Sequence, residues 1–455
     1  MDMQQKTQSD LDAGTKGEAQ KASRREAESI AAKPEPENPS MNEHMMELIC
    51  ERENVKEALK RVKANKGAPG IDGMTVGELP GYLREHWPAV RDSLLNGSYR
   101  PQPVRRVEIP KPDGGTRKLG IPSVLDRFVQ HAMMQVLQPQ WDPTFSGSSF
   151  GFRPGRSAHH AVAQAQHYIQ SGYTWVVDLD LEKFFDRVNH DILMSRVAKR
   201  VSDKRVLKLI RAFLTAGVLE QGLVSASDEG TPQGGPLSPL LSNLMLDDLD
   251  REVERRGLHF ARYADDCNVY VRSERAGLRV MAGLKTFLAQ KLKLTVNETK
   301  SAVARPTQRK SLGFTFHMGR HGVQRSLASK TLLRFKERVR VITQRTRGAS
   351  LEQVITALRR YLTGWRGYFG FCETPSVLKH LEGWLRRRLR CLVWKQWKRG
   401  PARYKALRAL GVGRDLAAQA AGSQHGPWRM SNSPALTKAL GNRYLASHGL
   451  PSLCS

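Results

Sequence analysis

The sequence predicts a mixed α/β fold over roughly its first two thirds and an all-α fold over the remainder. Short β-prone runs alternate with helical patterns between residues 174 and 291. A hairpin-turn signal, Asp113-Gly114-Gly115, separates two further β-prone runs. Beyond Arg325 the pattern becomes helical and basic. A chain of 455 residues exceeds one ordinary core, so we expect two to four packed units.

The first 140 residues are predicted to be mostly helical. Residues 1–40 contain no Phe, Tyr or Trp and end in a proline-interrupted run, which is typical of a flexible tail. Helices broken by a Gly/Pro-rich loop at 65–73 are expected up to about Arg100. A hairpin within 104–122 and a helix over 124–137 follow.

The middle and last thirds are predicted from periodicity and capping signals. Ser350 with Gln353 indicates a capping box, and Thr374-Pro375 indicates an N-cap followed by Pro at the first helical position. The elements expected in the middle third are a strand at 174–180, helices at 190–200, 204–215, 237–250 and 276–291, and a hairpin at 259–272.

The charge balance indicates a polyanionic partner. Lys plus Arg number 73 against 44 Asp plus Glu, a formal charge of +29 with a pI near 10.2. Nucleic acid is the first candidate and an anionic membrane the second. No apolar run approaches the roughly 18 to 20 residues of a membrane-spanning helix, and no signal peptide is evident. The five scattered cysteines suit a reducing cytoplasm.

Acidic residues at two places indicate a metal-dependent site. Asp265 and Asp266 lie at the tip of the predicted 259–272 hairpin, where a solvated turn is the alternative interpretation. Asp178 and Asp180 share one face of the predicted strand, because side chains alternate with period two. Magnesium prefers oxygen ligands, and two ions about 4 Å apart can promote phosphoryl displacement. The pattern therefore favours nucleotidyl transfer.

Ordered motifs then resemble those of group II intron reverse transcriptases. Tyr263-Ala264-Asp265-Asp266 resembles their YxDD box, and Asp180 followed by Phe185 resembles their first palm motif. The resemblance covers most of residues 50–320. Its other blocks are NKGAPGIDG (65–73), IPKPDGGTRKLGIP (109–122), SFGFRPGRSAHHAV (149–162), GTPQGGPLSPLLSNLMLDDLD (230–250), LKLTVNETK (292–300) and KSLGF (310–314).

The resemblance implies an α+β right-hand polymerase, in which fingers and palm combine an antiparallel sheet with helices. An all-α thumb/maturase domain would follow the palm. The implied divisions are a disordered tail at 1–40, fingers and palm at 41–325, thumb/maturase at 326–400, and a short RNA- or DNA-binding region at 401–455. No Cys/His cluster or HNH-like arrangement follows the thumb, so endonuclease activity is not expected.

The resemblance also implies roles for single residues. Asp180, Asp265 and Asp266 would hold two magnesium ions, with Asp178 as the rival strand ligand or a structural acid. Phe185 would exclude a 2′-hydroxyl and so select deoxynucleotides. The remaining contacts with the dNTP, template or pyrophosphate would come from Lys111, Arg117, Gln233 and Lys300, of which Lys300 is equally interpretable as a surface lysine.

A basic helical segment resembles the thumb, or maturase domain, of the same family. Leucines from Leu378 to Leu392 recur every three or four residues and predict an apolar seam. Ten Lys or Arg residues lie between 386 and 408, largely off that seam, which suits a phosphate backbone. The nucleic-acid-binding candidates are Arg386, Arg387, Arg390, Lys395, Lys398 and Arg399.

The implied activity is that of an RNA-directed DNA polymerase that copies its group II intron RNA during retrohoming and acts as a maturase in splicing. Its partners would be intron RNA, a primer–template duplex and a DNA target site in the bacterial cytoplasm, associated with the nucleoid. The alternative is a catalytically silent RNA-binding splicing chaperone on a polymerase scaffold. A defence-type reverse transcriptase is disfavoured, because it would not be expected to carry the maturase-like segment at 326–400.

Overall fold

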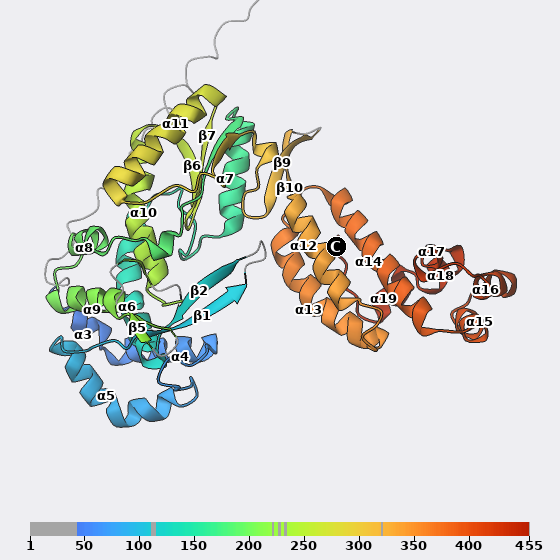
Figure 1. Ribbon diagram of the computed structural model, residues 1–455, viewed down its shortest axis with the longest axis horizontal. Helices are drawn as coiled ribbons and strands as arrows, with labels where there is room; N and C mark the ends of the chain where they lie inside the picture. The colour runs from blue at the N-terminus through green and yellow to red at the C-terminus, as the bar shows by residue number, and fades with distance from the viewer. Residues whose placement is uncertain are drawn as a thin grey trace, which may run out of the picture.

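The structure is a computed structural model that describes residues 43–110, 115–220, 223–225, 229–231, 234–319 and 322–454. An α/β body contains the elements up to β8, and a helical arm formed by α12 to α19 extends from one side of it (Figure 1). The expected change from mixed α/β to all-α structure is confirmed, with the last strand ending at Leu327.

The N-terminal part of the body combines helices with a small sheet of strand order β2-β1-β4-β5. The expected hairpin is present, with β1 and β2 antiparallel and Ile109 level with Arg117, although its turn falls on 111–114, outside the described residues. The elements are α3 (Met45–Ile49), α4 (Arg52–Asn65), α5 (Leu79–Leu95), β1 (Val104–Pro110), β2 (Thr116–Ile121), α6 (Val124–Trp141), η1 (Asp142–Thr144), β4 (Val218–Glu220) and β5 (Leu223–Ser225).

A second sheet, of order β6-β7-β3-β8, is antiparallel throughout and forms the centre of the body. It confirms the strand expected at 174–180 and the hairpin expected at 259–272. The elements are α7 (Ala158–Gln170), β3 (Trp175–Leu179), η2 (Phe184–Asp186), α8 (His190–Ala198), α9 (Lys204–Thr215), α10 (Ser238–Arg255), β6 (His259–Tyr263), β7 (Asp266–Val271), α11 (Glu274–Phe287), η3 (Leu288–Leu292) and β8 (Ala302–Ala304).

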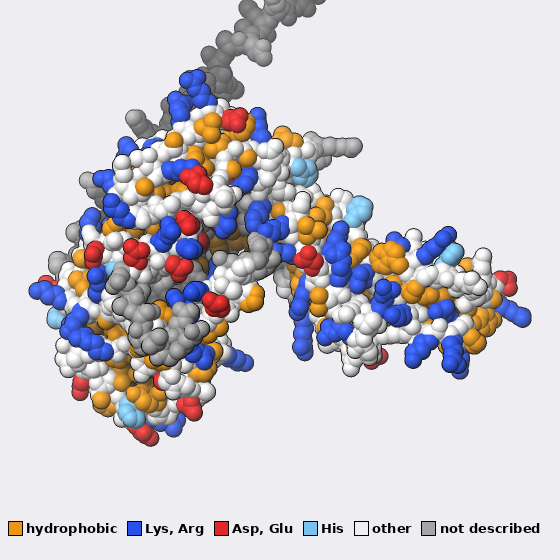
Figure 2. Space-filling model, in the orientation of Figure 1, with side chains coloured by type: hydrophobic (Ala, Val, Ile, Leu, Met, Phe, Trp, Pro, Cys, Tyr) orange, Lys and Arg blue, Asp and Glu red, His pale blue; other side chains and the backbone are white. Residues whose placement is uncertain are grey.

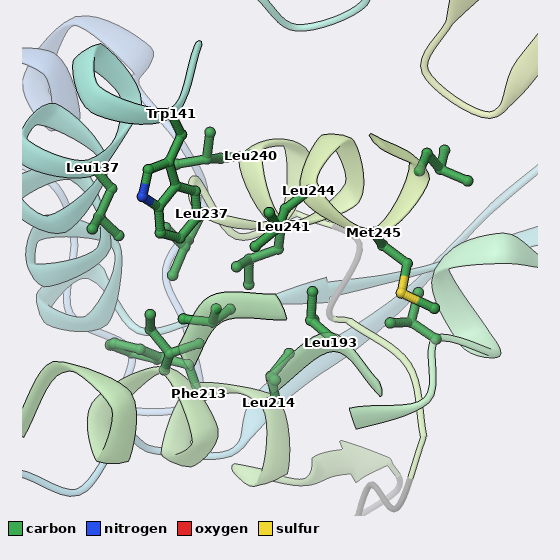
Figure 3. Close-up of a cluster of buried hydrophobic side chains, with 14 of the residues drawn as sticks. Leu137, Trp141, Leu193, Phe213, Leu214, Leu237, Leu240, Leu241, Leu244 and Met245 are labelled. Carbon is green, nitrogen blue, oxygen red and sulfur yellow. The ribbon is translucent and has the colours of Figure 1, made fainter. Parts of the chain in front are cut away.

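Side-chain alternation assigns the two faces of this sheet to different cores. Val177 and Val269 belong to a cluster with α10 and α11, whereas Val176 and Tyr270 pack with α7. The first cluster continues to α6 and α9, where Leu137, Trp141 and Leu240 lie together (Figure 3). Their burial explains why α6 continues past 137 and through Pro139 to Trp141.

The arm follows a two-stranded ribbon of β9 and β10. The capping box at the start of α13 is confirmed, because Ser350 Oγ accepts from Gln353 N at 3.2 Å and Gln353 Oε1 accepts from Ser350 N at 2.9 Å. The elements are η4 (Pro306–Gln308), β9 (Phe314–Gly319), β10 (Gly322–Leu327), α12 (Ser329–Ile342), α13 (Leu351–Phe369), α14 (Pro375–Gln396), α15 (Gly400–Ala409), α16 (Arg414–Ala421), α17 (Pro427–Met430), α18 (Pro434–Ala439) and α19 (Asn442–Ser447).

One expected cap is different in the structure. α14 begins at Pro375 as predicted, but the Thr374 side chain accepts no hydrogen bond from the helix. Its hydroxyl lies 2.8 Å from Cys372 Sγ and 3.2 Å from Ser326 Oγ instead. Thr374 therefore joins the start of α14 to the β-ribbon. In the described part of the chain, no helix is both long and apolar enough to cross a bilayer.

Candidate active site

A cleft of about 1440 Å³ opens between the β1–β2 hairpin, the central sheet and α12. Basic side chains line it on three sides: Arg106, Arg117 and Lys118 on the hairpin side, Lys183, Lys300 and Arg309 beside the sheet, and Lys310, Lys330 and Arg334 toward the arm. Lys and Arg side chains are also spread over the visible face of the body, and they lie densely over the arm (Figure 2). The cleft is therefore suited to a polyanion.

Strand register brings the sequence-predicted acids together at one end of the sheet. Leu179 is level with Cys267, and Tyr263 is level with Asp266. Asp180, one residue beyond Leu179, therefore comes level with Asp266. Period-two alternation places these two acids on the same face of the sheet, and both line the cleft together with Asp265. The three sequence-predicted acids therefore line one cleft at the same end of the sheet.

The turn that carries Asp265 is held from below by a buried arginine. Ala264 has a φ of +56°, which is uncommon for a residue with a side chain. Arg262 donates to the Ala264 carbonyl oxygen at 2.9 Å and forms an ion pair with Asp250 at 2.6 Å. The same guanidinium donates to Ser149 Oγ at 2.8 Å. The guanidinium also donates to Asn243 Oδ1 at 3.1 Å. Arg262 therefore connects the turn to Asp250, Ser149 and Asn243.

Gly151 supports the same turn by its lack of a side chain. A Cβ built at Gly151 would lie 3.1 Å from Ala264 Cα and closer still to Ala264 N. The neighbouring backbone is hydrogen bonded to β6, because Phe150 N donates to Arg262 O at 2.8 Å and Arg262 N donates to Ser148 O at 2.9 Å. The segment around Gly151 therefore packs directly against the acidic turn.

Burial and neighbouring acids raise the pKa values of Asp265 and Asp266. Burial is the main cause that raises the pKa of Asp266 to about 7, and the charges of Asp265, Asp180 and Asp178 add to it. The Asp266 side chain is nevertheless open to the cleft, so it is enclosed by protein while remaining accessible to a ligand. Burial also raises the pKa of Asp265, with the charge of Asp180 contributing. A cation would relieve this repulsion.

The carboxylate oxygens of Asp180, Asp265 and Asp266 suit magnesium, although the three carboxylates do not surround one common position. Among the described residues, no three Asp, Glu, His or Cys side chains converge as they would around a bound ion. Asp180 instead pairs with Lys300, whose Nζ lies 3.2 Å from Asp180 Oδ2. Lys300 is thus a residue of the site, and its ammonium occupies a position where a metal cation would compete for Asp180.

Asp178, the rival of Asp180, is engaged elsewhere. Arg309 donates to Asp178 Oδ2 from Nε at 2.8 Å and from Nη2 at 2.6 Å. The same guanidinium also donates to the Lys300 carbonyl oxygen, so it connects Asp178 to the segment that carries Lys300. This arrangement favours the interpretation of Asp178 as a structural acid.

The two adjacent phenylalanines have different surroundings. Both residues contribute to the cleft wall, but Phe184 is 2% exposed and belongs to the core, whereas Phe185 is half-buried. Their rings meet edge to face at 5.2 Å. Thr231 N donates to Phe185 O at 2.7 Å, and a Cβ at Gly230 would lie 2.8 Å from the same oxygen. The Gly230 segment therefore fixes the backbone that presents the Phe185 ring.

Of the residues expected to contact the nucleotide, the structure places three. Arg117, on β2, lines the cleft, and its charge lowers the pKa of Asp265 against the larger effect of burial. Phe185 and Lys300 also line the cleft. Lys111 and Gln233 lie outside the described residues, so their roles stay predictions.

Two protein families match the chain in succession. Residues 109–316 match the family described as "Reverse transcriptase (RNA-dependent DNA polymerase)", and residues 332–411 match "Group II intron, maturase-specific domain". Residues 109–316 therefore belong to the reverse transcriptase family, and residues 332–411 belong to the group II intron maturase-specific domain family.

Two curated relatives each match slightly less than half of the chain. Protein YkfC of Escherichia coli (strain K12) is 42% identical over 228 residues, which are 49% of this chain and 60% of YkfC. The group II intron-encoded protein LtrA of Lactococcus lactis subsp. cremoris is 36% identical over 206 residues, 45% of this chain and 34% of LtrA. The chain therefore spans less than two thirds of the length of either relative.

Solved structures give a weaker likeness. A chain of the partial Cas6-RT-Cas1–Cas2 complex is 23% identical, with a TM-score of 0.35, over 54% of this chain and 42% of its own length.

The basic residues of this chain that are expected to bind nucleic acid fall into two groups. Lys395, Lys398 and Arg399 are exposed. Arg386, Arg387 and Arg390 make contacts within the chain: Arg386 pairs with Glu382 at 3.0 Å, while Arg387 and Arg390 contact the segment around α17. Arg390 is only 9% exposed, which corrects the expectation that it lies on the solvated side of α14.

Sequence reasoning missed the residues that hold the acidic side chains and their turn in place. Arg262, Asp250, Gly151 and Arg309 contact the acidic residues or the turn that carries them, but none was a candidate. One signal was available: Arg262 is a charged residue at a buried position of a β-prone run, which requires an acid partner. The partner itself cannot be identified without the fold.

Proposed function

We propose that this chain is an RNA-directed DNA polymerase that copies group II intron RNA into DNA and assists the splicing of that RNA. One observation carries the proposal: Asp180, Asp265 and Asp266 lie together at the end of the central sheet, in a cleft rimmed by Lys and Arg. The match to the reverse transcriptase family supports this assignment. The activity would be attack of a primer 3′-hydroxyl on the α-phosphate of a dNTP.

Asp180, Asp265 and Asp266 would hold two magnesium ions. Bound there, the ions would supply activation of the attacking hydroxyl and neutralisation of the charge that develops on the phosphates. The raised pKa values of Asp265 and Asp266 support this role, because burial and the nearby acids disfavour the charged carboxylates that a cation would stabilise. Asp178 is not included, since the Arg309 guanidinium already occupies its carboxylate.

The other cleft residues would bind and orient the nucleotide. The Phe185 ring lies in the cleft on a fixed backbone and would clash with a 2′-hydroxyl, so it selects deoxynucleotides. Arg117 would fork across triphosphate oxygens together with Lys111, and Gln233 would contact the nucleotide or the template. Lys300 would release Asp180 when metal binds and then face the departing pyrophosphate.

The maturase assignment adds an RNA partner. The match at 332–411 covers α13 and α14, and the basic residues of α14 continue into α15. We propose that the basic residues of α14 and α15 bind intron RNA, the primer–template duplex and the DNA target site, in the bacterial cytoplasm near the nucleoid. A catalytically silent splicing chaperone is the second candidate, and the retention of all three acids in an open cleft argues against it.

The test is primer extension by the purified full chain on an RNA template with Mg²⁺ and dNTPs. Asp265→Asn should abolish extension while RNA affinity stays within about twofold, because the substitution removes a metal ligand and little positive surface. The matched control is Asp191→Asn, an exposed acid on α8 that pairs with Arg211. Extension that survives Asp265→Asn would sink the metal assignment. Loss of extension and RNA binding together would indicate misfolding instead.

A further inference from the structure

The C-terminal helices build a face on α14 that the polymerase cleft does not include. Trp428, on α17, is 41% exposed although it is one of the largest apolar side chains in the chain. The Arg387 guanidinium lies over its ring at 4.1 Å and donates from Nη2 to the Trp428 carbonyl oxygen at 3.1 Å. Arg387 therefore covers one face of the indole and holds the ring in a fixed orientation.

One turn further along α14, Arg390 is buried as a cation without an acidic partner. Its Nε donates to the Ser431 carbonyl oxygen at 2.7 Å, and it forms no ion pair within the described residues. Burial lowers the pKa of Arg390, and the neighbouring charges of Arg386 and Arg387 lower it further. A buried guanidinium among other cations is costly unless an anion joins it.

A pocket of about 550 Å³ lies at Arg390. Leu410, Thr437 and Tyr444 contribute to its wall, and two exposed cations, Lys438 and Arg443, line it from α18 and α19. Glu352, on α13, is an acid near this wall, where its charge adds to the burial that raises the pKa of Tyr444. Three cations therefore surround a concave site that has room for a phosphate.

The stacked tryptophan and the pocket are connected through Ser431. Arg387 Nε donates to Ser431 Oγ at 3.4 Å, and Arg390 Nε donates to the carbonyl oxygen of the same residue. Ser431 is fully buried and joins the two arginines to α17. We call this surface the C-terminal strip; its residues are Trp428, Arg387, Arg390, Lys438 and Arg443.

We propose that the C-terminal strip binds a single-stranded nucleic acid, with a base stacked on the open face of Trp428 and a backbone phosphate in the Arg390 pocket. An aromatic ring beside a basic groove is how proteins bind single strands without reading sequence. A paired duplex is excluded from this mode, because its base faces are already stacked. The proposal deepens the proposed function, on which it rests, by giving the nucleic-acid substrate a second binding surface outside the cleft.

The stacking half of the proposal is tested by anisotropy of the full chain with a labelled 12-nucleotide single-stranded RNA and with a hairpin of the same length. Trp428→Leu should weaken single-strand binding about 5- to 150-fold, the range for loss of one stacked base. The loss for the hairpin should be clearly smaller. Trp428→Phe should restore most of the single-strand affinity, since it restores an aromatic face. Equal losses for both RNAs, or no rescue by Phe, would overturn the stacking.

The phosphate half is tested by salt dependence. Lys438→Ala combined with Arg443→Ala should flatten the slope of log K against log salt by about 0.7 for each phosphate that the variant no longer neutralises. The matched control is Lys204→Ala combined with Lys208→Ala, two exposed cations on α9 outside the strip and the helical arm, which should change the slope less. Equal slopes for both double variants would refute the phosphate site.

Two further outcomes separate the possible ligands and the two proposals. If millimolar inorganic phosphate raises the Tm of the unmodified chain but not of the Lys438/Arg443 variant, while RNA slopes stay equal, the pocket takes free anions only and the proposal fails. If the unmodified chain extends primers with Mg²⁺ but strip variants bind RNA normally, only the strip proposal fails. If the unmodified chain does not extend primers while the strip variants bind RNA more weakly, the polymerase proposal fails and the strip proposal stands.

Discussion

Arg262 and Asp250 form a completely buried ion pair, 2.6 Å between Nη2 and Oδ2, directly beneath the turn that carries Asp265 and Asp266. Burial raises the pKa of Asp250, and the Arg262 charge opposes that effect. Because Arg262 also donates to the Ala264 carbonyl oxygen, the pair joins α10 to the acidic turn. Its effect on folding and its effect on the turn should be separable.

Arg262→Leu should lower the free energy of unfolding by about 3–5 kcal/mol, because it leaves the Asp250 charge buried without a partner. Adding Asp250→Leu should recover most of that stability, since two apolar side chains replace the two charges. Primer extension should stay low in the double variant, because Ala264 O still lacks its donor. Chemical denaturation and extension rates measure the two effects. Extension that recovers in step with stability would show that the pair serves folding alone.

Gly151→Ala should reduce the extension rate by about 100-fold, because the new methyl group would displace Ala264 and with it the acids of the turn. The control is Gly147→Ala, four residues earlier, where an added Cβ meets nothing within 4 Å. Single-turnover extension at saturating dNTP gives the rates. Similar rates for the two variants would mean that the turn tolerates displacement.

Asp266→Asn should stabilise the metal-free protein at pH 8 while abolishing extension. Because folding raises the pKa of Asp266 from 3.8 to about 7, charging this carboxyl costs stability as pH rises from about 4 to 7, and the full cost is present at pH 8. A gain of about 1 kcal/mol, reduced for access to solvent, would raise the Tm of a chain of 455 residues by about 1 °C. Mg²⁺ should raise the Tm of the unmodified chain more than that of the variant. A lower Tm for metal-free Asp266→Asn would contradict the repulsion.

The adjacent phenylalanines should respond differently to the same substitution. Phe184→Ala removes a buried ring and should cost about 3–5 kcal/mol of unfolding free energy. Phe185→Ala removes a cleft ring and should increase incorporation of ribonucleotides relative to deoxynucleotides, with a smaller loss of stability. Extension with mixed nucleotide pools measures the selectivity. Unchanged sugar selectivity in Phe185→Ala would refute its role as the steric gate.

The sequence was sufficient for the acids because their placement depends on local patterns. Alternation along 174–180 and the hairpin at 259–272 place Asp180 and Asp266 correctly once the strands pair. The supporting interactions depend on residues distant in the chain, which no local pattern specifies. Arg309 reaches Asp178 across 131 positions, and Arg390 meets Ser431 across 41. Arg390 was therefore placed on the solvated side of its helix, because the docking of α17 was not foreseeable.

The second hydrophobic core joins parts that the sequence assigned to separate domains. It contains Ala161 and Val162 of α7, Val176 of the central sheet, and Leu358 and Leu385 of the arm. A fragment that stopped at residue 325 would leave one side of α7 facing water, and we expect it to aggregate rather than fold. On the proposed function, a descendant copy could therefore lose DNA synthesis by substitutions in the cleft, but not by loss of the body. A lineage that retained splicing assistance alone would still have to inherit the entire body.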